Sequence, residues 1–262
     1  NNQDFRVLFW AQVPGNGVYT TTSLKSVTLE QNLSANAENY AAFANQDEIT
    51  YGENLVGRTI TLVRPVAQLN IATSAESLKL GEDQNGEYAQ TTVSFKTTGV
   101  KVEGLSTTYN VATGNAGADK STFTYSATRP YDADPNTADN LSEKTIEVND
   151  KTYKYVSMNY LGFAQNGGDN VNVSYTIETN EVGTIANTIN NVPVKANHRT
   201  NIIGNLITST SDYTVTLENT WPEEEINVEV VSVSTAAGLQ EAIDDIPAGT
   251  EGNIKLEGNI DL

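Results

Sequence analysis

Apolar and polar residues alternate with a period of two along most of this chain, and that pattern restricts the fold to one built from β-strands. In Ser26–Glu30, for example, Val27 and Leu29 alternate with polar residues. Successive side chains of a strand point to opposite faces of a sheet, so such segments are typical of strands with one buried face. Later strands are predicted at 92–96, 99–103, 121–127, 145–149, 152–157, 171–178, 192–194, 200–208 and 212–218. Their spacing, with turn residues between them, predicts an all-β protein containing an antiparallel sandwich.

The N-terminal segment is predicted to form a hairpin over residues 5–21. Phe5–Trp10 is an almost continuous apolar run, as expected for a strand buried on both faces. The turn signal Pro14-Gly15-Asn16-Gly17 separates it from a second strand at Val18–Thr21, because Gly and Asn tolerate positive φ. The sequence starts at Asn1 and enters a strand almost at once. We expect an export segment, and the first strands of a domain, upstream of it.

Pro65 interrupts a strand pattern and marks a predicted domain boundary. Thr59–Val63 alternates, and the apolar segment Val66–Ala72 follows the proline. Proline cannot donate to a ladder, so it is expected at an edge, at a bulge or at the start of a new sheet. We therefore predict one β-sandwich domain over residues 1–64 and a second over residues 65–221.

The segment 104–143 is rich in Thr, Asn, Gly and Asp, and it predicts a long surface loop of the kind that often carries binding residues. Within it, four oxygen-bearing residues fall at positions 1, 3, 5 and 12 of an EF-hand-like loop, which suits calcium. These candidate ligands are Asp132, Asp134, Asn136 and Glu143. Pro135 and Thr137 stand where such a loop needs flexibility and glycine, so an ordinary Asx-rich turn is the alternative.

Residues 222–262 are predicted to be a linker and a strand–helix–strand tail. The acidic Pro222-Glu223-Glu224-Glu225 precedes an alternating strand at 226–233. Apolar residues then follow a helical spacing over 236–246, and a strand pattern returns at 254–262. This order resembles the first coil of a pectate-lyase-like parallel β-helix, although the tail could instead pair with a neighbouring sheet.

The composition excludes several classes of function. Thirty-three acidic residues against fifteen basic ones give a formal charge of −18, which would repel nucleic acid and anionic membranes and also favours solubility. There is no cysteine, and therefore no disulfide, thiol nucleophile or thiolate metal site. The sequence contains no apolar run long enough to span a bilayer.

No enzyme signature stands out. His198 is the only histidine, so any Ser/His/Asp triad would need it, yet its sequence context indicates a turn or packing role. GxSxG, HExxH, GxxxxGK[ST] and GxGxxG after a strand are all missing. Paired carboxylates are uninformative in so acidic a chain. The twelve tyrosines indicate strand packing, with a carbohydrate-stacking row as the alternative.

Two segments carry a family resemblance. One is TLVRPVAQLNI at 61–71, and the other runs from Val192 to Trp221 and contains Asn197, His198 and Arg199 before a strand. With these segments, residues 60–221 resemble the C-terminal sandwich of the fimbrillin surface proteins of Bacteroidetes, in which they form the opening and closing edges. The resemblance implies two transthyretin-like Greek-key sandwiches in a lipoprotein of the outer membrane or fimbrium, without enzymatic activity or cofactor.

The same resemblance implies the partners and leaves two alternatives open. A fimbrillin assembles with other subunits, or with itself, by strand exchange, and it adheres to a host or bacterial surface glycan or protein. The appended tail suits a tip adhesin better than a polymerising stalk subunit. The alternatives are a carbohydrate-binding surface lipoprotein of a glycan-uptake system, and the N-terminal part of a larger β-helix protein that acts on polysaccharides.

Overall fold

The structure is a computed structural model of the chain, and it describes residues 4–52, 59–80, 91–128, 145–208, 212–218, 230–233 and 253–256. In those ranges the only helical elements are two single 3-10 turns, η1 (Glu38–Tyr40) and η2 (Glu76–Leu78). All other regular structure is strand. This confirms the predicted all-β class. The physical reason is that a period of two places the apolar residues on one face of a strand, whereas a helix needs a period of 3.6.

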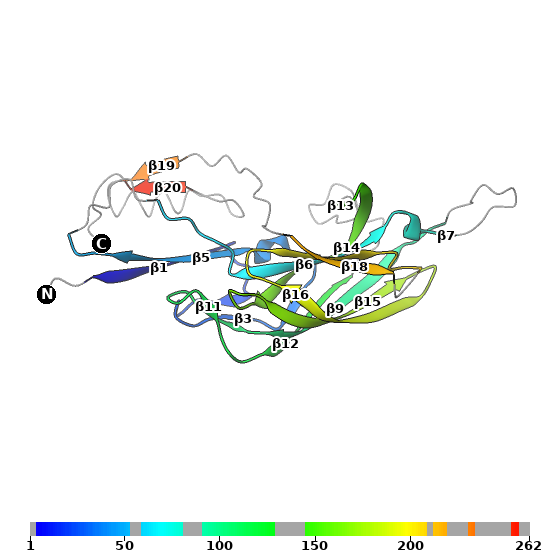
Figure 1. Cartoon of the computed structure of the whole chain (residues 1–262), viewed down its shortest axis with the longest axis horizontal. Helices are drawn as coiled ribbons and strands as arrows, with labels where there is room; N and C mark the ends of the chain where they lie inside the picture. Colours follow the sequence, from blue (N-terminus) through cyan, green and yellow to red (C-terminus); the bar gives the residue numbers. More distant parts are fainter. Residues whose placement is uncertain are drawn as a thin grey trace, which may run out of the picture.

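Two five-stranded sheets face each other and form a sandwich (Figure 1). The first sheet has the order β16-β15-β9-β12-β4 and the second β13-β14-β6-β17-β18. The first consists of β4 (Asn32–Ser34), β9 (Phe95–Leu105), β12 (Ser121–Thr128), β15 (Asp169–Thr179) and β16 (Thr184–Val194). The second consists of β6 (Val66–Ser74), β13 (Thr145–Val148), β14 (Lys151–Phe163), β17 (Arg199–Gly204) and β18 (Tyr213–Leu217).

The core between the sheets follows the predicted alternation most clearly in β15. Val171, Val173, Tyr175 and Ile177 are each about 1% exposed or less, whereas the residues between them face outward or are only partly covered. Several strands are longer than the sequence predicted. The separate strands predicted at 92–96 and 99–103 are wrong in part, because Phe95–Leu105 is one continuous strand, and β14 and β16 extend beyond 152–157 and 192–194.

β6 lies at the centre of the second sheet, and all nine of its residues are buried. It pairs antiparallel with β14 and parallel with β17. A second parallel pair joins β4 to β12. The predicted antiparallel sandwich is therefore corrected to a mixed one, because period-two alternation fixes which side chains face the core but not the direction of the neighbouring strand.

The N-terminal strands do not form the predicted hairpin. β1 (Phe5–Gln12) pairs with β5 (Ala42–Ile49), whereas β2 (Tyr19–Thr20) pairs with β3 (Val27–Leu29). Gly15 and Gly17 do adopt positive φ, of 75° and 68°, so the turn signal was correct although the chain leaves it toward another sheet. No residue of β1 is buried, so the prediction of burial on both faces is also wrong.

A four-stranded sheet covers the end of the sandwich next to this ribbon. Its order is β11-β10-β3-β2, with β10 at Thr108–Asn110 and β11 at Asn115–Ala116. The segment predicted as a loop at 104–143 thus begins with the end of β9, a small hairpin and β12, and residues 129–144 lie outside the described ranges.

Strands on both sides of residue 64 share sheets, since β3 pairs with β10 and β4 with β12. The division into residues 1–64 and 65–221 stays a prediction, and a boundary there would separate strands that are hydrogen-bonded to one another. Pro65 does stand directly before β6, at the start of a new strand.

Two short strand pairs complete the described structure. β7 (Lys79–Leu80) pairs with β8 (Thr91–Thr92), and in the tail β19 (Val230–Val233) pairs in parallel with β20 (Asn253–Leu256). The helix predicted at 236–246 lies outside the described residues. Within the described ranges, no helix is long and apolar enough to cross a bilayer.

Candidate functional site

The segment Asn197–Arg199 forms the turn that opens β17. Asn197 has a φ of 59°, and its backbone N–H donates to the Val66 carbonyl at 3.0 Å. The His198 carbonyl accepts from the Gln68 N–H at 3.0 Å, and the His198 ring Nδ1 lies 2.8 Å from the Ala196 carbonyl oxygen. These contacts explain the sole histidine as a structural residue of a turn, as the sequence indicated.

The two segments that carry the fimbrillin resemblance are neighbours in space. Arg199 pairs with Gln68 and Ile202 with Ile71 in the parallel register of β17 and β6. The resemblance placed these segments at the edges of a sandwich, whereas the structure places both strands inside the sheet, with β18 at its edge. Trp221 lies outside the described residues.

A buried polar ladder joins these strands. The Asn70 amide donates to the Asn201 side-chain oxygen at 2.8 Å, and the Asn201 amide donates to the Glu218 carboxylate at 2.6 Å. Asn70 and Asn201 are 0% and 1% exposed. Because a buried amide without partners is costly, this ladder fixes the pairing of the two central strands.

The four candidate calcium ligands, Asp132, Asp134, Asn136 and Glu143, lie outside the described residues, so calcium binding stays a prediction. Elsewhere in the described part of the chain, no group of three His, Cys, Asp or Glu side chains is arranged to hold a metal ion.

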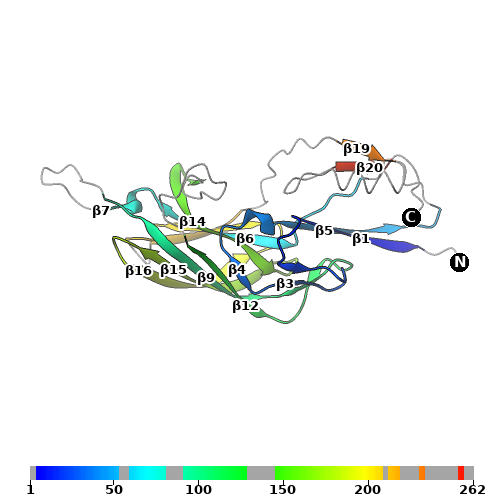
Figure 2. The same ribbon diagram turned by 180° about the vertical axis from the view of Figure 1, so that it is seen from behind.

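The β1–β5 ribbon is the first candidate interaction surface. It extends away from the sandwich (Figures 1 and 2) with a register that runs from Phe5 opposite Ile49 to Gln12 opposite Ala42. Among the described strands, none pairs with the other edge of β1. An edge of unpaired N–H and C=O groups is a template for an additional strand.

The two faces of the ribbon differ in their contacts. On one face, Leu8 and Trp10 pack against the main core, and the Trp10 ring meets Tyr19 edge-on with ring centres 5.4 Å apart. On the other face, Val7 and Phe9 belong to neither cluster of buried side chains. Phe5, at the tip, is 52% exposed. The ribbon is therefore anchored on one face and carries apolar groups on the other.

The second candidate surface is a small pocket beside the β10–β11 hairpin, which we call the hairpin pocket. It has a volume of about 320 Å³, and its lining includes Lys25, Ser26, Thr108, Tyr109, Asn110 and Asn115. The first two residues come from the turn before β3, and the others come from the hairpin. Arg6 of the ribbon donates to the Ala112 carbonyl of the hairpin turn at 2.8 Å, so the two surfaces are adjacent.

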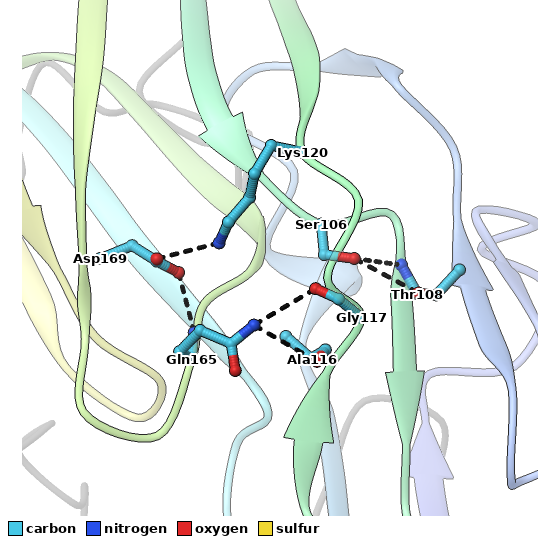
Figure 3. A network of polar contacts seen from close by, with 7 residues as sticks. All are labelled: Ser106, Thr108, Ala116, Gly117, Lys120, Gln165 and Asp169. Atoms are coloured by element: carbon cyan, nitrogen blue, oxygen red, sulfur yellow. Dashed lines mark hydrogen bonds and ion pairs between the residues drawn. The ribbon is translucent and has the colours of Figure 1, made fainter.

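Polar contacts behind the hairpin hold its base (Figure 3). The Gln165 side-chain amide donates to the Ala116 and Gly117 carbonyls at 3.3 and 3.2 Å, while its backbone N–H donates to Asp169 at 2.9 Å. Asp169 also pairs with Lys120 at 2.9 Å. Gly117 has no room for a side chain, because an added Cβ would lie 2.0 Å from Thr108 Oγ1. The hairpin is thus fixed in place before any ligand arrives.

The tyrosines favour packing over a stacking row. Among the described residues, only Tyr51 and Tyr213 are exposed tyrosines, at 60% and 37%, and they belong to different parts of the fold. Tyr125 and Tyr175 are almost fully buried, and burial raises the pKa of both phenols above the usual value. Tyr88 and Tyr131 lie outside the described residues.

The sequence predicted a surface loop over the region that contains the hairpin, but it did not predict the pocket. The pocket needs residues 25–26 beside residues 108–117, and no local pattern encodes that contact. The strand pairing of Tyr109 with Val27 creates it.

A family model described as a family of unknown function, DUF6562, matches residues 1–247. The chain belongs to that family. Similar solved structures include a candidate cell adhesion protein from Bacteroides ovatus, with 11% identity over 86% of this chain and 70% of that chain, and a TM-score of 0.37. A candidate cell adhesion protein from Bacteroides uniformis has 13% identity over 84% and 73%, with a TM-score of 0.36.

A fimbrial protein from Bacteroides vulgatus has 14% identity over 82% of this chain and 77% of that chain, with a TM-score of 0.35. At this level of likeness, the names apply to those proteins alone. No curated protein matches the sequence.

Proposed function

We propose that this member of the DUF6562 family is a non-enzymatic structural or adhesion protein of the cell surface, a fimbrial subunit or tip adhesin that assembles by β-strand addition. The observation that carries the proposal is the edge of β1 that pairs with no described strand, on a ribbon that extends from the sandwich. In strand addition, main-chain hydrogen bonds supply affinity and alternate side chains supply specificity. β1 offers both, with Phe5, Val7 and Phe9 alternating along it.

The resemblance of residues 60–221 to fimbrillins supports the same proposal and adds its location. A fimbrillin is exported, anchored as an outer-membrane lipoprotein and assembled with other subunits or with its own copies. The structural role of His198 in a turn supports the absence of a Ser/His/Asp triad. The division into two transthyretin-like domains, and a calcium ion in the segment 132–143, belong to the proposal and not to the described fold.

The parallel pairing of β19 with β20 favours a second candidate, in which the tail begins a β-helix of a longer polysaccharide-active protein. Consecutive coils of a β-helix stack their strands in parallel, so this pair is the contact that a first coil would make. A downstream sequence with further coils of that period would favour this candidate over the adhesin.

Strand addition is tested by light scattering coupled to size-exclusion chromatography, with synthetic peptides of residues 253–262 and residues 5–12 added in turn. We expect one peptide to bind stoichiometrically and raise the melting temperature. We also expect Val7→Lys to abolish that binding, because charge on an edge strand opposes added strands. Val182→Lys is the matched control, since Val182 is also an accessible valine, 43% exposed, but lies in the β15–β16 turn.

A protein that stays monomeric at all concentrations and ignores both peptides would contradict assembly through this edge. Equal loss of binding in Val7→Lys and Val182→Lys would also count against it, because the effect would then come from net charge and not from the ribbon.

A further inference from the structure

The hairpin pocket is rich in hydrogen-bond donors and contains a cation, although the chain as a whole has a formal charge of −18. None of its lining side chains is acidic. Lys25 makes no ion pair with any residue that the structure describes, which is also true of Lys151, Lys154 and Lys195. What distinguishes Lys25 is its place in a pocket without acidic side chains, where a cation favours an anionic ligand.

Tyr109 contributes a hydroxyl that is fixed in position. Its ring stacks on Phe163 with ring centres 5.3 Å apart and an interplanar angle of 28°, and the residue is only 7% exposed. Tyr109 lines the pocket, and in the described part of the chain its hydroxyl has no hydrogen-bond partner. Burial raises the pKa of this phenol, so the hydroxyl keeps its proton and is ready to donate it to a ligand oxygen.

Two carboxamides add donors in a defined orientation. The Asn110 side-chain oxygen accepts from the Ala112 N–H at 2.9 Å, and the Asn115 side-chain oxygen accepts from the Asn166 amide at 3.0 Å. With both oxygens engaged, the NH₂ groups are the parts left to bind a ligand. The hydroxyls of Ser26 and Thr108 can donate or accept, which suits sugar hydroxyls.

We propose that the hairpin pocket binds the carboxylate of an acidic saccharide, a uronic or sialic acid residue, through Lys25, Tyr109 and the amides of Asn110 and Asn115. Its volume of about 320 Å³ lies at the small end of ligand pockets, roughly 300–1,000 Å³, and suits a single sugar ring. The carboxylate meets the cation and donors, and the ring hydroxyls meet Ser26 and Thr108. The choice of a glycan rests on the proposed surface function, but binding does not require assembly.

Calorimetry on the Val7→Lys variant tests the inference independently of strand addition. The probes are trigalacturonate and sialyllactose, their neutral counterparts methyl-esterified trigalacturonate and lactose, and a pentaglutamate peptide. We expect an acidic saccharide to bind at least about tenfold more tightly than its neutral counterpart, which corresponds to 1.4 kcal/mol, and more weakly as salt is added.

Substitutions in the pocket locate the site. Lys25→Gln should weaken binding about tenfold or more, and Tyr109→Phe, which removes only an oxygen, about threefold to tenfold. Lys151→Gln and Tyr51→Phe are matched controls at exposed positions outside the pocket, and they should leave the affinity unchanged.

Three results would overturn the inference. The first is that neither acidic saccharide binds at millimolar concentration. The second is that neutral and acidic saccharides bind equally tightly. The third is pentaglutamate binding as tightly as the saccharides, which would assign the pocket to acidic peptides. Because the Val7→Lys protein serves in every measurement, failure here leaves the strand-addition result intact, and the converse also holds.

Discussion

Of the strands β1 and β6, β1 has the more apolar sequence, yet it is the more exposed of the two. β1, FRVLFWAQ, has no buried residue, whereas β6, VAQLNIATS, carries Gln, Asn, Thr and Ser and is buried along its whole length. The difference lies in their neighbours. β6 has a strand on each side and a sheet packed against it, while β1 pairs only with β5 among the described strands.

This contrast shows that burial here follows topology more than hydrophobicity. The polar groups of β6 can be buried because Asn70 bonds to Asn201, and Thr73 donates to the Gly204 carbonyl at 3.2 Å. β1 has apolar side chains on both faces but only one face in contact with the main core. Apolar surface held outside a core is a common feature of interaction sites.

Amide hydrogen exchange should show the largest difference between the two strands. Amides of β6 are expected to exchange only through global unfolding, which costs about 5–15 kcal/mol in domains of this kind. Amides on the free edge of β1 should exchange several orders of magnitude faster, because they need no opening of the sandwich. Equal protection of both strands would mean that another strand covers β1.

Truncating an apolar side chain should destabilise the protein more in β6 than in β1, and this is the next largest difference expected. Leu69→Ala in β6 is expected to cost about 2–5 kcal/mol, because Leu69 is fully buried and a cavity would remain. Phe9→Ala in β1 should cost about 1 kcal/mol, since that side chain is only partly covered and belongs to neither cluster. Urea unfolding of both variants measures the difference. Similar losses would show that the ribbon folds as part of the sandwich core.

The sequence predicted the sandwich well but not its connections. Alternation identified Val27 and Leu29 as core residues and predicted a strand at 171–178, because side-chain direction is a local property of a strand. The partner of a strand is not local. Nothing in Phe5–Gln12 specifies Ala42–Ile49 over the nearer Tyr19–Thr20, and nothing in Arg199–Gly204 specifies a parallel neighbour.

The candidate site was harder still to predict. The long Thr- and Asn-rich segment pointed to the right region, and the glycines at 114 and 117 are understood only with the structure. Gly114 has a φ of 66°, and Gly117 lies against Thr108. The pocket arises where the turn before β3 meets the hairpin, so its lysine and tyrosine could not be associated from their positions in the sequence.

Breaking the amide ladder tests how β6 tolerates its polar residues. Asn201→Ala should cost about 1–3 kcal/mol, because it leaves the Asn70 amide without its buried acceptor and Glu218 without its donor. Asn172→Ala is the matched control, since Asn172 is exposed on β15, and it should change stability by less than about 0.5 kcal/mol. Denaturant unfolding of the two variants gives the comparison. If Asn201→Ala lowers the free energy of unfolding no more than Asn172→Ala does, the ladder does not explain why Asn70 can be buried.

The smallest effect is expected at a carboxylate that holds the turn at the far end of the sandwich. Glu181 accepts from the Ser94 hydroxyl at 2.7 Å and from the Ser94 N–H at 2.8 Å, and these bonds lower its pKa below the usual value. A carboxyl whose pKa is lowered by folding stabilises the fold above its unfolded pKa, and that contribution is lost as pH falls through the folded pKa. Glu181→Gln should therefore lower the melting temperature slightly near neutral pH, and the gap from the parent protein should close as the pH falls below the usual pKa of a glutamate, about 4.3. Glu48→Gln in the ribbon is the comparison, because it removes the exposed ion pair with Arg6. Its effect on the melting temperature should shrink with added salt, whereas the effect of Glu181→Gln should persist. A gap for Glu181→Gln that stayed constant down to the lowest pH would mean that the carboxylate's charge has no part in holding the turn.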